Sequence, residues 1–135
     1  MGHMRRRERI RRANRTATIL AVALGAAGTM HFLRPTHFDR IVPEALPPRL
    51  TTLASGVAEL GIAAGLAFPA TRRASGWAAA ALFAAVFPAN LKMANDLLEH
   101  PTSSRAMRLV GVLRLPLQLP LVLWSMRVGR HAPKP

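Results

Sequence analysis

The stretch that decides the fold covers residues 74–91 and reads ASGWAAAALFAAVFPANL, 18 consecutive positions without a charge. Residues 16–33 (TATILAVALGAAGTMHFL) are another 18 positions without Lys, Arg, Asp or Glu. Residues 50–71 and 109–126 each carry one charge, Glu59 and Arg114. A helix needs about 20 mostly apolar residues to cross about 30 Å of hydrocarbon. The sequence therefore predicts an all-α integral membrane four-helix bundle, with spans at about 16–33, 50–69, 74–95 and 107–126.

Two other interpretations of these stretches fit less well. A soluble helical bundle would need polar faces that repeat every 3.6 residues, and neither AAAALFAAVF nor TILAVALGAAG has one. The first stretch follows a basic segment, as the apolar region of a signal peptide does. The sequence after it, HFLRP at residues 31–35, does not resemble a small-residue cleavage site. We therefore expect the first stretch to be a retained helix.

The 135 residues allow one domain, and the charge divides it unevenly. Residues 1–4 look like a cloning remnant ahead of a native start at Met4. Seven of the arginines lie in residues 5–15, which we expect to be a basic cytoplasmic tail. Residues 16–130 then form the transmembrane domain, and residues 131–135 a second cytoplasmic tail.

The arginines also predict how the bundle is oriented. With the N-terminus inside, the cytoplasmic side holds 12 basic residues and the outer side 5. Basic residues favour the cytoplasmic side of a membrane, so both termini are expected inside. The basic tail would contact anionic lipid headgroups. Only 5% of residues are aromatic and none is Tyr, which disfavours base stacking, so nucleic acid is not an expected partner.

Several cofactor classes have no signature in this sequence. The absence of Cys excludes a disulfide framework, a thiolate nucleophile and a Cys-ligated zinc or iron–sulfur site. A haem held by two histidines is unsupported because only His31 lies within a span. His31, His37 and Glu59 have no spacing that fixes a metal geometry, so no metal site is predicted. Ser55 shows no Ser–His–acid pattern, and catalytic residues stay unknown.

Polar residues at a similar depth in all four spans are the main functional signal. At about 1.5 Å per residue, Glu59 lies about 13 Å and Arg114 about 10 Å below the outer surface. Asn90 and His31 also fall in the outer half of their spans. A charge near the bilayer centre costs about 2.5–3.5 kcal/mol, so one that persists usually has a partner or a function. We predict a ligand-binding site formed by His31, Glu59, Asn90, Arg114 and Gln118, with Ser55 and Lys92 as further candidates.

The simplest arrangement of these residues is a Glu59–Arg114 ion pair extended by Gln118, which shares a helix face with Arg114 at the i,i+4 spacing. The same pair would equally serve as a packing lock between helices. Lys92 is expected to extend to the outer interface instead. The connection over residues 35–48 carries apolar residues among prolines and is expected either to lie at the membrane interface or to fold back over the mouth of the bundle. Pro88, Pro116 and Pro120 are expected to interrupt the third and fourth spans.

The chain resembles the DoxX family, small bacterial membrane proteins with four helices. The resemblance is carried in order by residues 28–32 (GTMHF), Pro35, Phe38, and residues 55–60 (SGVAEL), 87–93 (FPANLKM) and 114–118 (RLPLQ). It spans roughly residues 16–130. The family is named after a subunit of a thiosulfate:quinone oxidoreductase. The resemblance implies a four-span bundle in the inner membrane of a bacterium, linked to quinone or sulfur redox chemistry.

Three functions remain open at this point. The first is an accessory or ligand-binding subunit that takes a quinone or lipid-like molecule and supports a partner oxidoreductase. The second is a transporter component for a lipid-like or anionic solute, which would act as a homodimer because four helices enclose little volume. The third is a structural or assembly protein whose Glu–Arg pair only locks the helices together. Whether the protein is an enzyme is left open.

Overall fold

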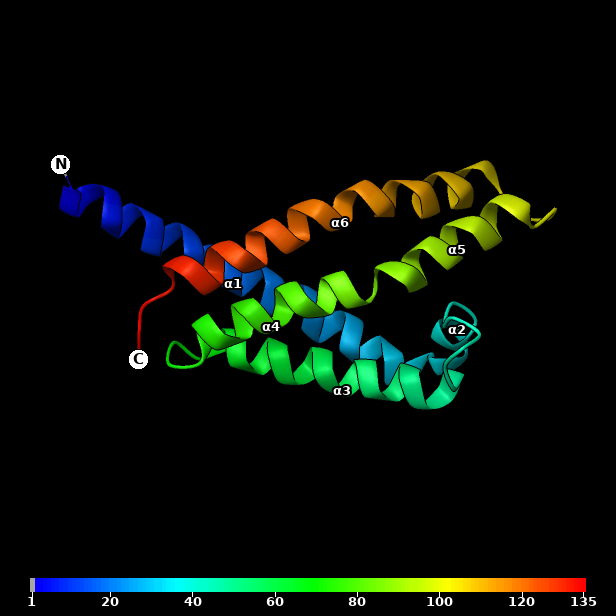
Figure 1. Cartoon of the computed structure of the whole chain (residues 1–135), viewed down its shortest axis with the longest axis horizontal. Helices are drawn as coiled ribbons and strands as arrows, with labels where there is room; N and C mark the ends of the chain where they lie inside the picture. Colours follow the sequence, from blue (N-terminus) through cyan, green and yellow to red (C-terminus); the bar gives the residue numbers. More distant parts are fainter. Residues whose placement is uncertain (1) are drawn as a thin grey trace.

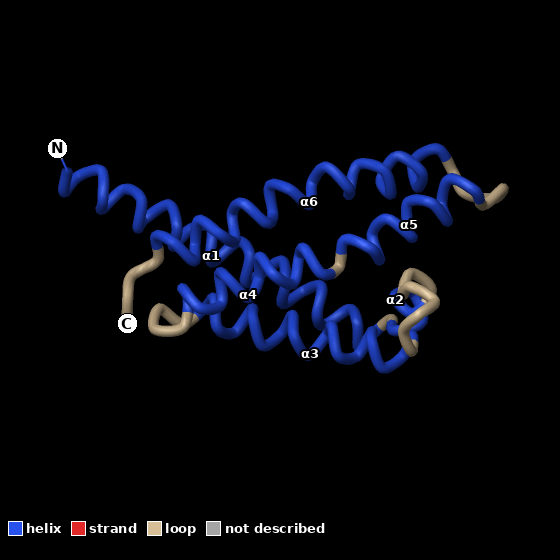
Figure 2. The backbone as a smooth tube through the Cα atoms, viewed as in Figure 1, coloured by secondary structure: helices blue, strands red, loops and turns tan. Residues whose placement is uncertain are grey.

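The computed structural model describes residues 2–135 and consists of helices joined by short loops (Figures 1 and 2). Met1, part of the expected cloning remnant, lies outside the described residues. Over residues 2–135 the structure contains no strand. The helices are α1 (Gly2–Leu33), α2 (Pro35–Asp39), α3 (Pro48–Ala67), α4 (Arg72–Ala85), α5 (Phe87–Glu99) and α6 (Arg105–His131).

Four helical segments are long and apolar enough to cross a membrane: α1, α3, α4 together with α5, and α6. At most 28% of the residues in their apolar windows are buried inside the protein. Large apolar side chains on their outer faces are between 63% and 69% exposed, namely Ile19, Val22, Leu50, Val57 and Leu119. Apolar surface of this extent is compatible with a lipid bilayer around the helices. The predicted all-α membrane bundle is confirmed.

The arginine-rich residues 5–15 continue α1 as regular helix. Ala13 and Ala17, at the base of this extension, are fully buried. Arg72 connects the C-terminal end of α3 to α1 at Asn14, close to where the basic extension of α1 begins. Its guanidinium donates to the Leu66 and Ala67 carbonyls at 2.8 Å each, and to Asn14 Oδ1 at 3.0 Å. It thereby satisfies two carbonyls that the end of α3 leaves free, and ties that end to α1.

The third span is broken into α4 and α5, as Pro88 predicts. Proline has no amide hydrogen and its ring crowds the preceding turn, so α4 ends at Ala85 and α5 begins at Phe87. Pro116 and Pro120 act differently, because both lie inside α6, which stays one helix over residues 105–131. The expectation that they interrupt the fourth span is therefore wrong, because no helix ends or begins at either proline.

Glycines allow close approach in two helix pairs. A Cβ on Gly76 of α4 would lie 2.5 Å from the backbone nitrogen of Gly129 in α6. A Cβ on Gly56 of α3 would lie 2.9 Å from the Cβ of His31 in α1. Only glycine allows the backbones to pack at these distances. The resulting pairs, α1 with α3 and α4 with α6, form the body of the bundle.

The two ends of the molecule differ. Both termini and the turn between α3 and α4 lie at one end (Figure 1). At the other end, α5 and the first half of α6 run apart from α1 and α3, and α2 lies beside the start of α3 (Figure 1). The candidate site lies between these two halves.

Candidate ligand-binding cavity

A cavity of about 490 Å³ lies between α1, α2 and α3 on one side and α4, α5 and α6 on the other. We call it the bundle cavity. Six of the seven residues predicted from the sequence line it: His31, Ser55, Glu59, Asn90, Arg114 and Gln118. They come from α1, α3, α5 and α6, so all four spans contribute. The structure thus brings together the polar residues that the depth comparison grouped.

His31 and Glu59 form one polar wall. His31 Nδ1 lies 3.3 Å from Glu59 Oε2, and the two side chains are only 10% and 9% exposed. The same Nδ1 is 2.8 Å from the Ala27 carbonyl oxygen. A carbonyl can only accept, so Nδ1 carries the hydrogen and donates it there. The His31 ring is also stacked on Phe38, with 3.7 Å between ring centroids.

Two buried oxygens on this wall have no hydrogen-bond partner within residues 2–135: Glu59 Oε2 and Thr52 Oγ1. Both residues are buried and both line the bundle cavity. A buried polar atom without a partner costs about 1–3 kcal/mol, so such atoms usually bind something. Thr52 was not among the predicted residues. Its position seven residues before Glu59, on the same helix face, is the signal that would have found it.

The expected Glu59–Arg114 ion pair is wrong. Glu59 lies beside His31, and Arg114 Nη1 donates to Met93 Sδ at 3.3 Å. The reason is how the helices pair: α3 packs on α1, whereas α6 packs on α4 and α5. Arg114 consequently lines the opposite side of the cavity and stays exposed. A Glu–Arg packing lock is therefore not how this bundle holds together.

The second polar wall is a hydrogen-bonded chain from Asn90 through Gln118 to Phe83. Asn90 Nδ2 donates to Gln118 Oε1 at 2.7 Å, and Gln118 Nε2 donates to the Phe83 carbonyl. Phe83 lies in the last turn of α4, just before the break that Pro88 causes. A helix end leaves carbonyl oxygens without intrahelical partners. Gln118 of α6 satisfies one of them, and this hydrogen bond links the end of α4 to α6.

The connection over residues 35–48 folds over the cavity mouth, as expected. Phe38, Ile41, Val42, Pro43 and Leu46 all line the bundle cavity. Asp39 and Arg49 form a 3.0 Å ion pair at its two ends. This connection therefore forms an apolar cover over the His31–Glu59 wall.

Lys92 does not line the bundle cavity. Its Nζ donates to Asp96 Oδ2 at 2.7 Å and to the Arg40 carbonyl at 3.1 Å. Lys92 thus links α5 to the connection that covers the cavity and helps to hold that connection in place.

The cavity can hold a molecule with one polar end. Glu59 Oε2 and Thr52 Oγ1 offer acceptors, and the Arg114 guanidinium offers donors. The rest of the wall is largely apolar and includes Leu24, Leu82, Phe83, Leu117 and Leu121. In the part of the chain that the structure describes, no three His, Asp or Glu side chains are grouped so as to hold a metal ion.

The comparisons with known proteins give one positive result. No curated protein and no solved structure matches the chain. A family described as "Domain of unknown function (DUF8561)" matches residues 20–129, a range that contains the six cavity residues predicted from the sequence. The match covers most of the chain and all four membrane-length segments, so the protein belongs to the DUF8561 family.

Proposed function

We propose that this protein binds a quinone or another lipid-like molecule in the bundle cavity, and serves as an accessory subunit of a membrane redox process. The observation that carries the proposal is the buried Glu59 carboxylate. One of its oxygens has no hydrogen-bond partner in residues 2–135, and it lines a largely apolar cavity. A ligand with a hydroxyl group would supply the missing hydrogen bond.

Glu59 and Arg114, on opposite sides of the bundle cavity, suit the two ends of such a head group. A quinol hydroxyl would donate to Glu59 on the α3 side. A carbonyl or anionic oxygen would accept from Arg114 on the α6 side, because guanidinium is well suited to oxygen acceptors. The volume of about 490 Å³ falls in the range of about 300–1,000 Å³ common for small-molecule sites. An isoprenoid or acyl tail would lie against the leucines and leave toward the lipid.

The redox part of the proposal rests on the resemblance to the DoxX family. His31 beside Glu59 would exchange protons with a bound quinol, since an imidazole ring has one nitrogen that can donate a hydrogen and one that can accept it. A partner oxidoreductase would deliver or take the electrons.

The proposed location is the inner membrane of a bacterium, with both termini in the cytoplasm. Support comes from the positions of the basic residues. Twelve of the 19 lie in residues 5–15, at the start of α4, or after residue 126, and these segments meet at one end of the molecule (Figure 1). Basic segments of this kind favour the cytoplasmic side. The bundle cavity would then lie in the outer half of the membrane.

Native mass spectrometry of the detergent-purified protein tests the proposal. The variants are Glu59→Gln and, as a matched control, Glu99→Gln, which removes the same charge from an exposed position at the end of α5. Decylubiquinol, the reduced form that carries the hydroxyl groups, is the added probe and is kept under reducing conditions, and copurified molecules are identified after release. We expect wild type and Glu99→Gln to retain a quinone or lipid that Glu59→Gln loses.

Two outcomes contradict the proposal. One is equal retention by all three proteins, which would mean that Glu59 does not contact the ligand. The other is a ligand-free wild type whose Glu59→Gln variant merely unfolds. That result would favour a structural role, in which the cavity residues only hold the helices together.

A further inference from the structure

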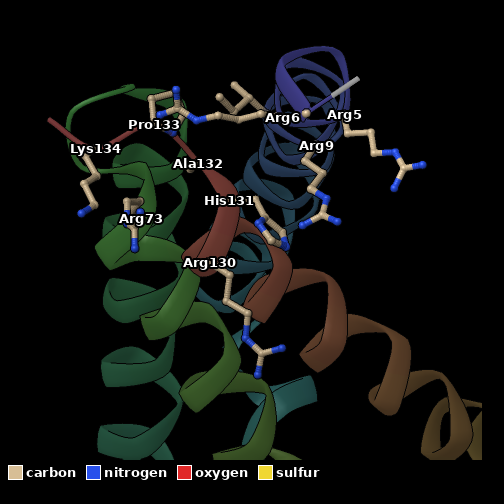
Figure 3. Close-up of a pocket in the computed structure, with 11 residues that line it drawn as sticks. Arg5, Arg6, Arg9, Arg73, Arg130, His131, Ala132, Pro133 and Lys134 are labelled. Atoms are coloured by element: carbon tan, nitrogen blue, oxygen red, sulfur yellow. The ribbon is translucent and has the colours of Figure 1, made fainter.

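A second cavity, of about 590 Å³, lies at the opposite end of the molecule from α2. Three segments that are distant in sequence surround it: the start of α1, the start of α4, and the end of α6 with the residues that follow (Figure 3). Figure 3 shows the α1 arginines on one side and Arg73 and Lys134 on the other, with His131 between them. We call this cavity the basic basin. Its titratable lining residues are Arg5, Arg6, Arg9, Arg73, Arg130, His131 and Lys134.

The basic basin has no counter-charge of its own. None of its lining residues is Asp or Glu. Glu8 is the one acidic residue in this part of the sequence, and it pairs with Arg12, which does not line the basin. Within residues 2–135, none of the seven titratable lining residues takes part in an ion pair. Cations gathered around one cavity repel each other and raise the local potential for anions.

Helix ends add to this potential. The first turn of α4 contains no acidic residue, and its N-cap, Thr71, makes no side-chain cap. The positive end of that helix dipole and its free amides therefore point to the basin side. The end of α6 contributes the opposite partial charge, which Arg130 and His131 offset in its last turn. The α1 arginines and Arg73 remain without a partner.

The basin lies at the level expected for phospholipid headgroups. Arg72, next to Arg73, is hydrogen-bonded to Asn14 and to the last carbonyls of α3. Asn14 comes two residues before the uncharged stretch 16–33 begins. Arg5, Arg6 and Arg9 therefore lie about 8–14 Å beyond Asn14 along α1, on the far side of the apolar zone.

We propose that the basic basin binds a phosphate-bearing anion with two or more negative oxygens, separately from the ligand of the bundle cavity. Guanidinium groups hold phosphate oxygens in bidentate pairs, and the lining is dominated by arginine rather than lysine. Two sources supply this chemistry, the headgroup of an anionic phospholipid and a free phosphate compound.

Two matched triple variants test the site. Arg6→Gln/Arg9→Gln/Arg73→Gln removes three lining cations from two helices. Arg7→Gln/Arg11→Gln/Arg127→Gln removes the same charge from exposed positions on α1 and α6 that do not line the basin. The full chain in neutral detergent is titrated with dihexanoyl phosphatidylglycerol, with inorganic pyrophosphate, and with dihexanoyl phosphatidylcholine as the zwitterionic comparison that has no net charge. Binding is followed by microscale thermophoresis, and circular dichroism confirms that each variant is helical.

The expected result is saturable one-to-one binding of an anionic probe by wild type. Kd should rise at least tenfold in the lining variant and stay within twofold in the control variant. Binding of phosphatidylglycerol alone identifies a lipid headgroup as the source, and comparable binding of pyrophosphate identifies a free phosphate. Equal weakening in both variants would overturn the proposal, because it would show that only total charge matters. Linear, unsaturable binding of both anions by wild type would overturn it as well, whatever the variants do.

Discussion

Gln118 is the residue on which the polar interior of the bundle depends most. It accepts from Asn90 Nδ2 at 2.7 Å and donates to the Phe83 carbonyl, so one buried side chain serves α4, α5 and α6. Its spacing from Arg114 indicated that it would point inward. The identity of its partners could not be predicted, since they depend on where α4 breaks and on which helix lies opposite.

Replacing Gln118 with Leu should lower the free energy of unfolding by about 1–3 kcal/mol, because the Phe83 carbonyl and the Asn90 amide lose their partner in an apolar interior. Thermal unfolding in detergent, followed by circular dichroism, measures the change. Leu119→Ala, at a lipid-facing neighbour, is the control and should have a smaller effect. An unchanged unfolding temperature in Gln118→Leu would show that the hydrogen-bonded chain does not stabilise the fold.

Glu59 shows the limit of sequence reasoning at the scale of one residue. Its depth in the second span marked it as costly and therefore as a candidate site residue. Depth does not determine direction around the bundle axis, and the nearest titratable side chain proved to be His31 on α1. Ser55 was recognised because it lies one turn from Glu59, whereas Thr52 lies two turns away and was missed. Its role becomes evident only from its buried oxygen without a hydrogen-bond partner.

At the scale of elements, glycine determines which helices approach closely. Gly76 and Gly129 lie against each other where α4 crosses α6. Gly61 and Gly65 have the GxxxG spacing but behave differently: Gly61 has nothing within 4 Å, whereas Gly65 packs against Ser75. The spacing alone could not distinguish a packed glycine from one that faces lipid.

Gly76→Ala should therefore destabilise the protein by about 1–3 kcal/mol, since the added methyl group would meet the Gly129 backbone, which can only move with its helix. Gly61→Ala should be neutral or stabilising by up to about 1 kcal/mol, because it removes glycine's flexibility without a clash. Chemical unfolding in mixed detergent compares the two variants. If both had the same effect, the α4–α6 contact would not be tightly packed.

Prolines show why helix boundaries were only partly predictable. Pro88 breaks the third span, yet Pro116 and Pro120 remain inside α6. A proline always removes one amide donor, but whether the helix ends there depends on what neighbouring helices offer the freed carbonyls. That information belongs to the packed bundle and is absent from the local sequence.

At the scale of the whole molecule, the uncharged stretches were enough to predict four membrane-length segments. How the helices pair was not predictable, because lipid-facing and protein-facing surfaces are both apolar in a membrane protein. For this reason the predicted Glu59–Arg114 ion pair is absent from the structure of residues 2–135, whereas the residues grouped by their depth do line one cavity.

The proposed topology can be tested with single cysteines, since the chain has none of its own. Ser103→Cys lies between α5 and α6, and Lys134→Cys lies at the opposite end of the molecule. In intact bacterial cells, a membrane-impermeant maleimide should label Ser103→Cys, and should label Lys134→Cys only after lysis. The reverse pattern would place the basic end outside and contradict the proposed orientation.

Photocrosslinking tests the central claim, a ligand site in the bundle cavity, most directly. A diazirine-bearing quinone analogue is added to the protein in nanodiscs, illuminated, and its attachment points are mapped by peptide mass spectrometry. We predict saturable labelling confined to cavity residues such as Phe38, Thr52, Phe83 and Leu117, which excess decylubiquinol suppresses and Glu59→Gln abolishes. Labelling spread over the lipid-facing residues Ile19, Val57 and Leu119, unaffected by competitor or by Glu59→Gln, would contradict it.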